Sequence, residues 1–379
     1  MRWKALLKTN LLRTASLNTA SLNTGPQKSG LRKSAARRTG TLKTATLKTA
    51  TVKTATLKTA TLKTVSLRTA LFCLLVGPLP LLAAGSAAAA SPVSLTSGFY
   101  SNPDSGPAVW VRDNPSDSRA ARIQSAIASQ PIARWFANES AGIGPAVSGY
   151  VGAADSHDKL PVLVAYNIPG RDACGGESSG GAGSVAAYRT WISTFAAAVG
   201  THPAVVVIEP DALSDFSCLT SAQITDRLAM LSYATQMFQQ KAPNTWAYLD
   251  AGHTNWVDPA TMASRLRSAG VANIRGFSLN VSNFYTTPSS ETYGNSINSA
   301  LGNTSHFAVD TSRNGNGSNG EWCNPAGRKL GVTPRVGSAE DLLLWVKTPG
   351  NSDGQCGVAP TVPAGQFSPD LAVRLIDGT

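Results

Sequence analysis

From about residue 91 onward, short apolar runs rich in β-branched residues alternate with longer amphipathic stretches. The apolar runs predict seven strands, at residues 132–136, 161–168, 204–209, 246–250, 276–281, 307–310 and 342–346. The stretches between them predict helices at residues 118–129, 184–199, 221–240, 259–269 and 290–301. Strands that alternate with helices are typical of βα units, so we predict an α/β fold with a seven-stranded parallel barrel. An open doubly wound sheet is the alternative, although no GxGxxG or GxxxxGK[ST] motif supports its nucleotide-binding form.

Four aspartates lie at or shortly after the ends of these apolar runs: Asp172, Asp211, Asp250 and Asp353. In a parallel barrel the carboxyl ends of the strands converge, and reaction sites form there. Any one of these residues could equally be a helix cap or a turn former, but four together favour chemistry. The run at residues 205–208 should be buried on both faces, so burial would raise the pKa of Asp211 toward that of a general acid. A carbohydrate-cleaving enzyme is the leading hypothesis.

The net charge of +11 comes from the N-terminal part of the chain. Residues 1–70 contain 15 of the 33 Lys and Arg residues, and the first acidic residue is Asp104. The rest of the chain therefore has 18 basic and 22 acidic residues, a net charge of −4. Because nucleic-acid affinity comes largely from Lys and Arg on phosphates, this balance argues against a nucleic-acid partner.

The first 90 residues have the composition of a leader. A five-residue TLKTA unit repeats over residues 41–64, and this period fits neither helix nor strand amphipathicity. An apolar stretch at residues 70–84 is followed by small residues up to Ala90, as in a signal peptide with its cleavage site. The stretch is too short and too broken by Gly and Pro for a stable membrane anchor. We expect a disordered or misassigned leader at 1–64, a signal peptide at 65–90 and one secreted domain at 91–379.

The number of cysteines is consistent with an exported protein. An even number in an exported chain favours two disulfides, with three possible pairings. Pairing in sequence order would tie together the loops that carry the aspartates. A zinc site is disfavoured because the chain has no CxxC motif and only four His residues, so we expect neither a metal nor a cofactor. The four cysteines of the mature part are Cys174, Cys218, Cys323 and Cys356.

Three tryptophans lie in polar, turn-rich segments rather than in apolar runs: Trp110, Trp256 and Trp322. An aromatic face stacks on the apolar face of a pyranose ring, while nearby Asp, Asn and Lys bind its hydroxyls. Each of these tryptophans could instead cover an edge of the core. Aromatic and carboxylate residues together favour a neutral polysaccharide as substrate. The tryptophans within strand or helix patterns are assigned mostly to the core: Trp135, Trp191, Trp246 and Trp345.

The segments YNIPGRDAC, VVVIEPDALS, DAGHTNW, FSLNVSNF, EWCNPAG and WVKTPGNSDG, in this order, resemble the motifs of glycoside hydrolase family 6, the secreted cellulases. The resemblance extends from about Phe99 to the C-terminus. It implies a distorted seven-stranded β/α barrel with a substrate tunnel or cleft at the carboxyl ends of the strands. It also implies hydrolysis of β-1,4-glucan with inversion at the anomeric carbon.

The resemblance implies a role for each matching residue. Asp211 would be the general acid, Asp172 would help to keep it protonated and assist the activation of water, and Asp353 would be the base, acting directly or through a water chain. Inversion needs room for water between acid and base, roughly 6.5–9.5 Å between the carboxyls. Arg171 would orient the carboxylates. With the aromatic argument included, the expected substrate-binding residues are Tyr166, Arg171, Trp110, Asp250, Trp256, Asn280, Trp322, Lys347 and Asn351.

Two positions depart from the family pattern. Ala173 separates the RD pair from Cys174, and Asn351 stands where the family often has Glu. Asn can still bind a sugar hydroxyl but carries no charge. We expect a secreted, monomeric endo-β-1,4-glucanase, because the connections are too short for tunnel-forming loops. The alternatives are an exo-acting cellobiohydrolase and an inactive carbohydrate-binding homologue.

Overall fold

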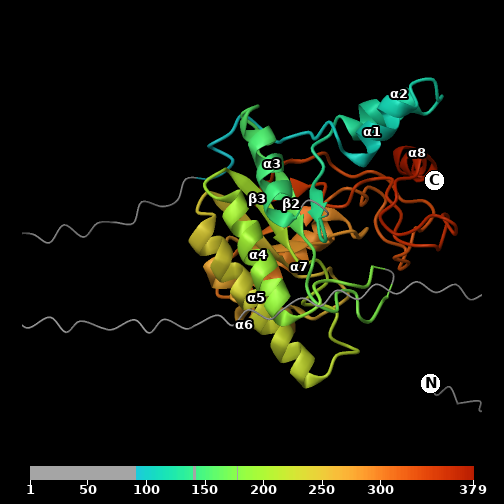
Figure 1. Ribbon diagram of the computed structural model, residues 1–379. Coiled ribbons are helices and arrows are strands. Elements are labelled where there is room, and N and C mark those ends of the chain that lie inside the picture. Colours follow the sequence, from blue (N-terminus) through green and yellow to red (C-terminus); the bar gives the residue numbers. More distant parts are fainter. Residues whose placement is uncertain (1–90, 140–141, 177) are drawn as a thin grey trace, which may run out of the picture. The chain divides into compact units, whose positions relative to one another are not determined.

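The computed structural model describes residues 91–139, 142–176 and 178–379, and the predicted leader and signal peptide lie outside them. The described residues form eight strands in one sheet, in the order β1-β2-β3-β4-β5-β6-β8-β7 (Figure 1). The strands are β1 (Arg134–Phe136), β2 (Val162–Ala165), β3 (Ala204–Ile208), β4 (Thr245–Asp250), β5 (Gly276–Leu279), β6 (His306–Asp310), β7 (Arg335–Val336) and β8 (Leu342–Leu344).

The sheet curls into a distorted barrel. β1 to β6 and β8 are parallel, and only β7 pairs antiparallel with its neighbour β8. Ile132, before β1, forms a parallel bridge with Trp345, after β8, and the Ala133 amide donates to the Trp345 carbonyl at 2.9 Å. This bridge joins the first parallel strand to the last. The seven-stranded parallel barrel is therefore confirmed, and β7 was missed because a two-residue exposed strand leaves no apolar run.

The alternation of side chains along β3 builds two layers of core. Val205 and Val207 belong to the cluster inside the barrel, whereas Val206 and Ile208 belong to the larger cluster between the sheet and its helices. Successive side chains of a strand point to opposite faces, so a strand covered on both faces must be apolar throughout. The predicted burial of this run on both faces is confirmed, which places Asp211 at the end of a fully buried strand.

Helices cover the outside of the barrel, with α4, α5 and α6 side by side (Figure 1). Their starts have local causes: Thr220 and Gln223 form a reciprocal capping box, and Asp258 caps the helix that begins with Pro259. The five predicted helices are confirmed within a few residues. The helices around the sheet are α3 (Ile143–Asp155), α4 (Val185–Val199), α5 (Ser221–Lys241), α6 (Pro259–Ser268), α7 (Thr287–Ala300) and a 3₁₀ turn at Val271–Asn273.

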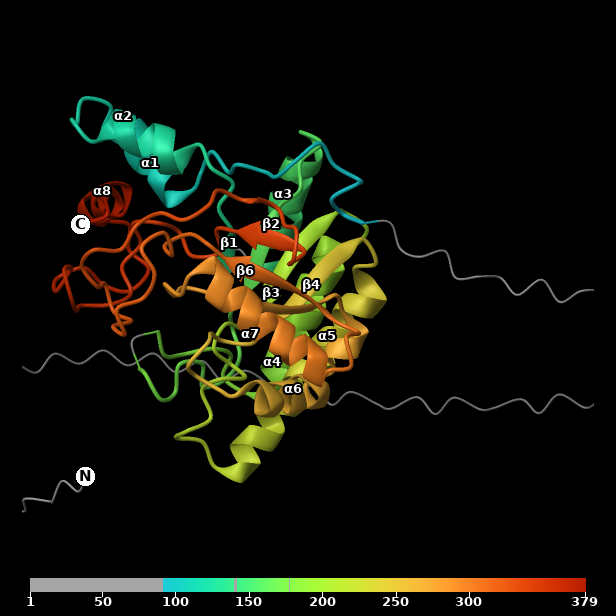
Figure 2. The same ribbon diagram turned by 180° about the vertical axis from the view of Figure 1, so that it is seen from behind.

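Three further helices gather beside the barrel, α1 (Gly106–Asp113), α2 (Ala120–Ile123) with a π-helical continuation at Gln124–Ala128, and α8 (Pro369–Asp377) (Figures 1 and 2). Trp110, which was expected to bind substrate, lies in α1. Pro107 starts a helix there, and the Trp110 ring packs against Phe367, with Arg119 over its face at 5.5 Å. Within the described ranges, no helix is long and apolar enough to cross a membrane.

Candidate active site

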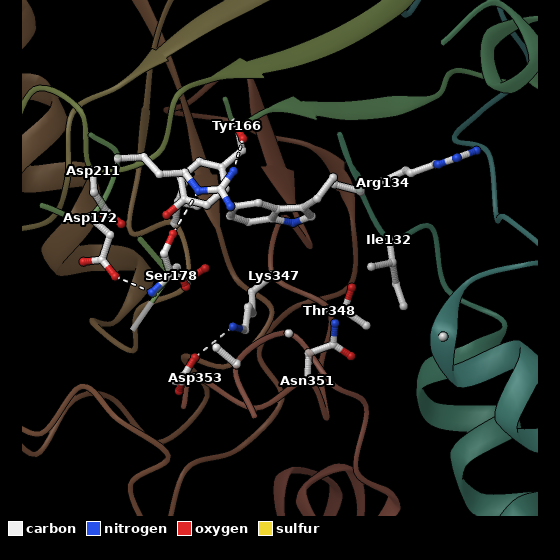
Figure 3. A pocket seen from close by; sticks show the side chains of 18 of the residues that line it. Ile132, Arg134, Tyr166, Asp172, Ser178, Asp211, Lys347, Thr348, Asn351 and Asp353 are labelled. Carbon is white, nitrogen blue, oxygen red and sulfur yellow. Dashed lines mark hydrogen bonds and ion pairs between the residues drawn. The ribbon is translucent and has the colours of Figure 1, made fainter. Parts of the chain in front are cut away.

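A cavity of about 1330 Å³ opens at the carboxyl ends of the strands. Figure 3 shows Asp172 and Asp211 together on one side, Arg134 and Ile132 toward the other side, and Lys347, Asp353 and Asn351 between them. Most of the expected site residues line this cleft. They are Tyr166, Arg171, Asp172, Asp211, Trp256, Trp322, Lys347, Asn351 and Asp353.

Asp211 follows β3 in an unusual backbone conformation. Glu209 and Asp211 both have positive φ angles, of 51° and 68°. Non-glycine residues persist in this region only when their surroundings hold them there, and they often mark functional sites. The Glu209 amide donates to the Ala165 carbonyl at 2.8 Å, and the Asp211 amide donates to Asp250 Oδ1 at 3.0 Å. The turn after β3 is thereby fixed with the Asp211 side chain in the cleft.

The surroundings of Asp211 favour its protonated form. Burial raises the pKa of Asp211 well above its ordinary value, and the charges of Asp250, Asp172 and Asp215 raise it further, against a smaller opposite effect of Lys347. Carboxyls that share a partly dry site cannot all ionise cheaply. Asp211 is therefore suited to donate a proton near neutral pH.

Asp250 was expected to bind substrate, and this is wrong in the structure. The residue is buried and does not line the cleft. Its Oδ1 accepts hydrogen bonds from the amides of Asp211 and Gly252, both at 3.0 Å, and its Oδ2 accepts one from the Ser278 hydroxyl at 3.2 Å. Asp250 therefore holds the backbone of Asp211 in place.

Asn280 is also buried outside the cleft, against the expectation of a sugar contact. Its amide nitrogen donates to the carbonyls of Tyr285 and Asp310, at 3.1 and 2.9 Å, and its oxygen accepts the Tyr285 amide at 3.0 Å. These bonds close the turn after β5. Sequence spacing placed Asn280 at the correct end of a strand but could not tell that its side chain points inward.

Asp353 lies between two cations that the fold brings together. Arg313 Nη1 donates to both carboxylate oxygens, at 3.0 and 2.8 Å, and Lys347 Nζ lies 2.9 Å from Oδ1. Burial alone would raise the pKa of Asp353, but Arg313 and Lys347 outweigh it and lower this pKa to about 2. The backbone amide of Asn324 donates to Asp353 Oδ2 at 3.1 Å. Arg313 was missed in the sequence because its contact is 40 residues away and no motif marks it.

The loop that carries Asp172 is held by Arg171 and by its own backbone. The Ser178 amide donates to Asp172 Oδ2 at 2.5 Å. Arg171 donates to the carbonyls of Ser178 and Tyr166, at 2.9 and 2.7 Å, and lies 4.6 Å over the Tyr166 ring. Arg171 thus orients the loop and the ring directly, and it acts on Asp172 only through Ser178. A Cβ at Gly175 would lie 2.3 Å from Asp172 Oδ1, so only glycine allows this approach.

The comparisons with known proteins agree with this geometry. The family model for "Glycosyl hydrolases family 6" matches residues 96–379. The chain belongs to this family. It is 53% identical over 314 residues to Endoglucanase 1 of Streptomyces halstedii, covering 82% of this chain and 98% of that protein. It is 43% identical over 286 residues to Endoglucanase A of Thermobispora bispora, covering 73% of this chain but 61% of that protein.

A solved family 6 structure has the same fold. The endoglucanase Cel6 from Mycobacterium tuberculosis, in complex with methyl-cellobiosyl-4-deoxy-4-thio-β-D-cellobioside, aligns with a TM-score of 0.70 at 39% sequence identity. The alignment covers 76% of this chain and 99% of that one. The family match confirms the resemblance inferred from the motifs and identifies the chain as a glycoside hydrolase.

The two disulfides of this family 6 chain follow sequence order. Cys174 bonds to Cys218, and Cys323 bonds to Cys356. Of the three pairings left open by the sequence, the one that ties the loops of the aspartates together is therefore present. The first bond joins the loop of Asp172 to the loop after Asp211, and the second joins the segment after Trp322 to the loop of Asp353.

Aromatic side chains line the family 6 cleft together with the aspartates. Trp256 and Trp322 are 40% and 52% exposed, so their faces are available to a ligand. Trp135, which the sequence assigned mostly to the core, lines the cleft edge-on to Tyr166, with ring centres 5.1 Å apart. Its indole nitrogen donates to the Val346 carbonyl at 2.8 Å. A short strand such as β1 does not reveal which face of its central residue is open.

Asn351 occupies the family's Glu position and lines the cleft. Its backbone amide donates to the Thr348 carbonyl at 3.0 Å, and its side-chain Oδ1 is buried with no hydrogen-bond partner in the described part of the chain. The position therefore offers the cleft an uncharged amide near Asp353.

Glu209 is a further buried carboxyl that the sequence did not single out. Both its oxygens accept a hydrogen bond from the backbone amide of Asn167, at 3.0 and 2.9 Å. Oε2 also accepts one from the backbone amide of Ile168 at 2.9 Å. Burial raises the pKa of Glu209 to about 7 despite these bonds. Glu209 ties the end of β3 to the segment that leads to Asp172.

Proposed function

We propose that this protein is a secreted endo-β-1,4-glucanase that hydrolyses cellulose or a related glucan with inversion. One observation carries the proposal: the cleft holds a carboxyl that favours its proton, Asp211, and a carboxylate that two cations keep ionised, Asp353. A pair of carboxyls with opposite protonation is what glycosidic cleavage requires. The names of the relatives, endoglucanases of 43% and 53% identity, support the same activity.

The residues have distinct roles in the proposed reaction. Asp211 gives its proton to the glycosidic oxygen as the bond to the anomeric carbon breaks. Water attacks that carbon from the opposite face, and Asp353 accepts the water's proton, either directly or through a second water. Asp172 faces Asp211 and keeps the acid protonated. Tyr166 lies beside the reacting ring, and Trp256, Trp322, Lys347 and Asn351 bind the chain on either side.

An open cleft supports endo attack over exo attack. Trp256 and Trp322 are each at least 40% exposed, whereas a tunnel would cover the aromatic residues that contact the sugar. An endo enzyme cuts inside the polymer, so the viscosity of soluble carboxymethyl cellulose should fall faster than reducing ends accumulate. A cellobiohydrolase would instead release reducing ends with little loss of viscosity.

The decisive experiment combines this assay with Asp211→Asn. The variant should keep the fold and lose about 10²–10⁴-fold in kcat, because the proton donor is gone. NMR of the first product from a soluble β-1,4-glucan should show the α-anomer. Wild-type protein that binds the glucan but releases no reducing sugar would instead support the inactive carbohydrate-binding homologue, for which Asn351 is the motivating substitution.

The N-terminal leader and the two disulfides support export through a signal peptide at 65–90 and a mature domain at 91–379. Mass spectrometry of secreted protein should give an N-terminus near Ser91. The mature enzyme acts as a monomer, which size-exclusion chromatography with light scattering tests directly.

A further inference from the structure

Asp215 is a carboxylate that neither the motifs nor the proposed roles account for. It lies four residues after Asp211, is 7% exposed and contributes to the lining of the cleft. Its amide donates to the Asp211 carbonyl at 2.9 Å, so the chain turns back on itself between the two residues. Burial of a carboxylate costs free energy unless hydrogen bonds or opposite charges compensate it.

The side chain of Asp215 joins two loops. Its Oδ2 accepts the amide of Cys174, two residues beyond Asp172, at 3.2 Å. The disulfide between Cys174 and Cys218 makes a covalent link between the same two segments. Arg227 adds a third link, because Nη1 donates to the Asp215 carbonyl at 3.2 Å and Nη2 donates to the Gly170 carbonyl at 2.5 Å.

We propose that Asp215 is a positioning residue of the hydrolytic site, whose carboxylate fixes the loop of Asp172 against the loop of Asp211 and whose charge faces the acid. The inference rests on the proposed glucanase activity and extends it to a residue outside the four aspartates of the motifs. If the role of Asp215 were purely structural, a neutral amide in its place would accept the hydrogen bond from the Cys174 backbone amide equally well.

The charge of Asp215 has a measurable consequence. The charged groups that act on Asp211 come from four segments: Asp250 at the end of β4, Asp172 after β2, Asp215 in the loop after β3, and Lys347 after β8. The three carboxylates raise the pKa of Asp211 and Lys347 lowers it. Removing one of the three negative charges makes ionisation of Asp211 easier, so its pKa falls.

Asp215→Asn separates charge from geometry. Its amide oxygen can still accept from Cys174, but the charge is lost. We expect the alkaline limb of kcat to move about 0.5–1.5 pH units lower, the order of shift that one nearby charge produces. The substrate should be hydroxyethyl cellulose, because a neutral polymer does not titrate in this range. Asp226→Asn, an exposed aspartate on α5, is the matched control and should leave the profile unchanged.

Asp215→Ala tests the geometric part. It leaves the partly buried Cys174 backbone amide without its acceptor, so the Asp172 loop loses one of its anchors. We expect kcat to fall about 10-fold or more with a smaller change in KM, since misplacement of catalytic groups costs rate rather than binding. Mass spectrometry of the non-reduced protein should show both disulfides intact, which separates this loss from misfolding.

The outcomes distinguish a failure of the proposed role of Asp215 from a failure of the proposed glucanase function. A pH profile of Asp215→Asn that superimposes on that of the wild type, with Asp215→Ala affecting only the melting temperature, would show that Asp215 is merely structural and overturn the proposal. Wild-type protein inactive on hydroxyethyl cellulose at every pH would refute the proposed function and, with it, the role of Asp215. An alkaline limb that shifts in Asp215→Asn but not in Asp226→Asn supports the proposal.

Discussion

At the scale of single residues, neighbouring carboxyls in one cleft are driven to opposite charge states. Asp211 has three carboxylates and one cation acting on it, whereas Asp353 has Arg313 and Lys347. Both residues are Asp, so the difference in pKa is made entirely by the residues that the fold brings to each. The general rule that pairs of titratable groups with separated pKa values mark acid and base applies to this pair.

Asp353→Asn is predicted to cost both stability and activity. Arg313 and Lys347 would face an uncharged amide in a buried site, and breaking such a pair typically costs about 3–5 kcal/mol. We expect the free energy of unfolding to fall by that order and kcat to fall at least about 100-fold. Urea denaturation and reducing-sugar release from soluble glucan measure the two effects.

A matched control for this prediction is Asp370→Asn, which breaks an exposed ion pair with Arg119 and should change stability by less than about 1 kcal/mol. The pH dependence follows from the lowered pKa. The stabilisation from Asp353 is complete above its ordinary pKa of 3.8 and is lost as the pH falls through about 2. If Asp353→Asn keeps the same acid sensitivity over pH 4 to 2 as the wild type, the ion pairs do not stabilise the fold.

Glu209→Gln should change how stability depends on pH. The folded-state pKa of Glu209 is raised to about 7 from 4.5 by burial, so its protonated form is the one that folding favours. This contribution is present below pH 4.5 and is lost as the pH rises through about 7. The wild type should therefore lose up to about 3 kcal/mol relative to Glu209→Gln across this window. Parallel stability curves of the two proteins between pH 4.5 and 7 would contradict the expectation.

At the scale of elements, the strands were predictable because nearly all are apolar runs, and the helices because most of those predicted begin at a side-chain cap. α1, α3 and α8 were missed, and the sequences of the first two, GPAVWVRD and IGPAVSGYVGAAD, contain the Gly and Pro that usually indicate loops. Trp110 was assigned to the cleft for the same reason. Side-chain direction was the other limit, since Asp250 and Asn280 end their strands as predicted but point into the protein.

The aspartates of the proposed reaction lie on loops rather than on strands, and disulfides restrain these loops. Replacing both Cys174 and Cys218 by Ser opens a link across 44 residues, for which the loop-entropy model gives a loss of about 4 kcal/mol. We also expect kcat to fall at temperatures where the variant is fully folded, because the loop of Asp172 loses its covalent anchor. Differential scanning calorimetry and initial rates at 25 °C measure the two effects.

The control for this prediction is the other pair, Cys323→Ser with Cys356→Ser, which spans 33 residues and should cost a similar amount of stability. Hydrogen exchange separates the two variants. Exchange should rise at residues 170–176 in the first variant and around residues 321–326 in the second. Uniformly faster exchange in both variants would mean that the disulfides act on global stability alone.

At the scale of the whole molecule, the two ends of the barrel differ: groups at the cleft contribute to both the proposed activity and stability, whereas a cluster at the other end is expected to contribute to stability alone. The carboxyl ends of the strands bear the cleft, while an ionic cluster occupies the other end. There Asp341 accepts hydrogen bonds from Arg275 at 2.7 and 2.8 Å and from the Tyr248 hydroxyl at 3.0 Å, and Arg275 lies 4.3 Å over the ring of Trp246. Conservation of function in such barrels is expected at the first end and of stability at the second.

Asp341→Asn tests this division. Arg275 would lose its bidentate partner, and because the two side chains are 28% and 10% exposed, the cost should be about 1–3 kcal/mol rather than that of a fully buried pair. The melting temperature should fall by several degrees. At 25 °C, however, kcat and its pH profile on hydroxyethyl cellulose should match those of the wild type, because no group of the cleft has changed. A fall in kcat of more than about threefold in the folded variant would show that the two ends of the barrel are coupled.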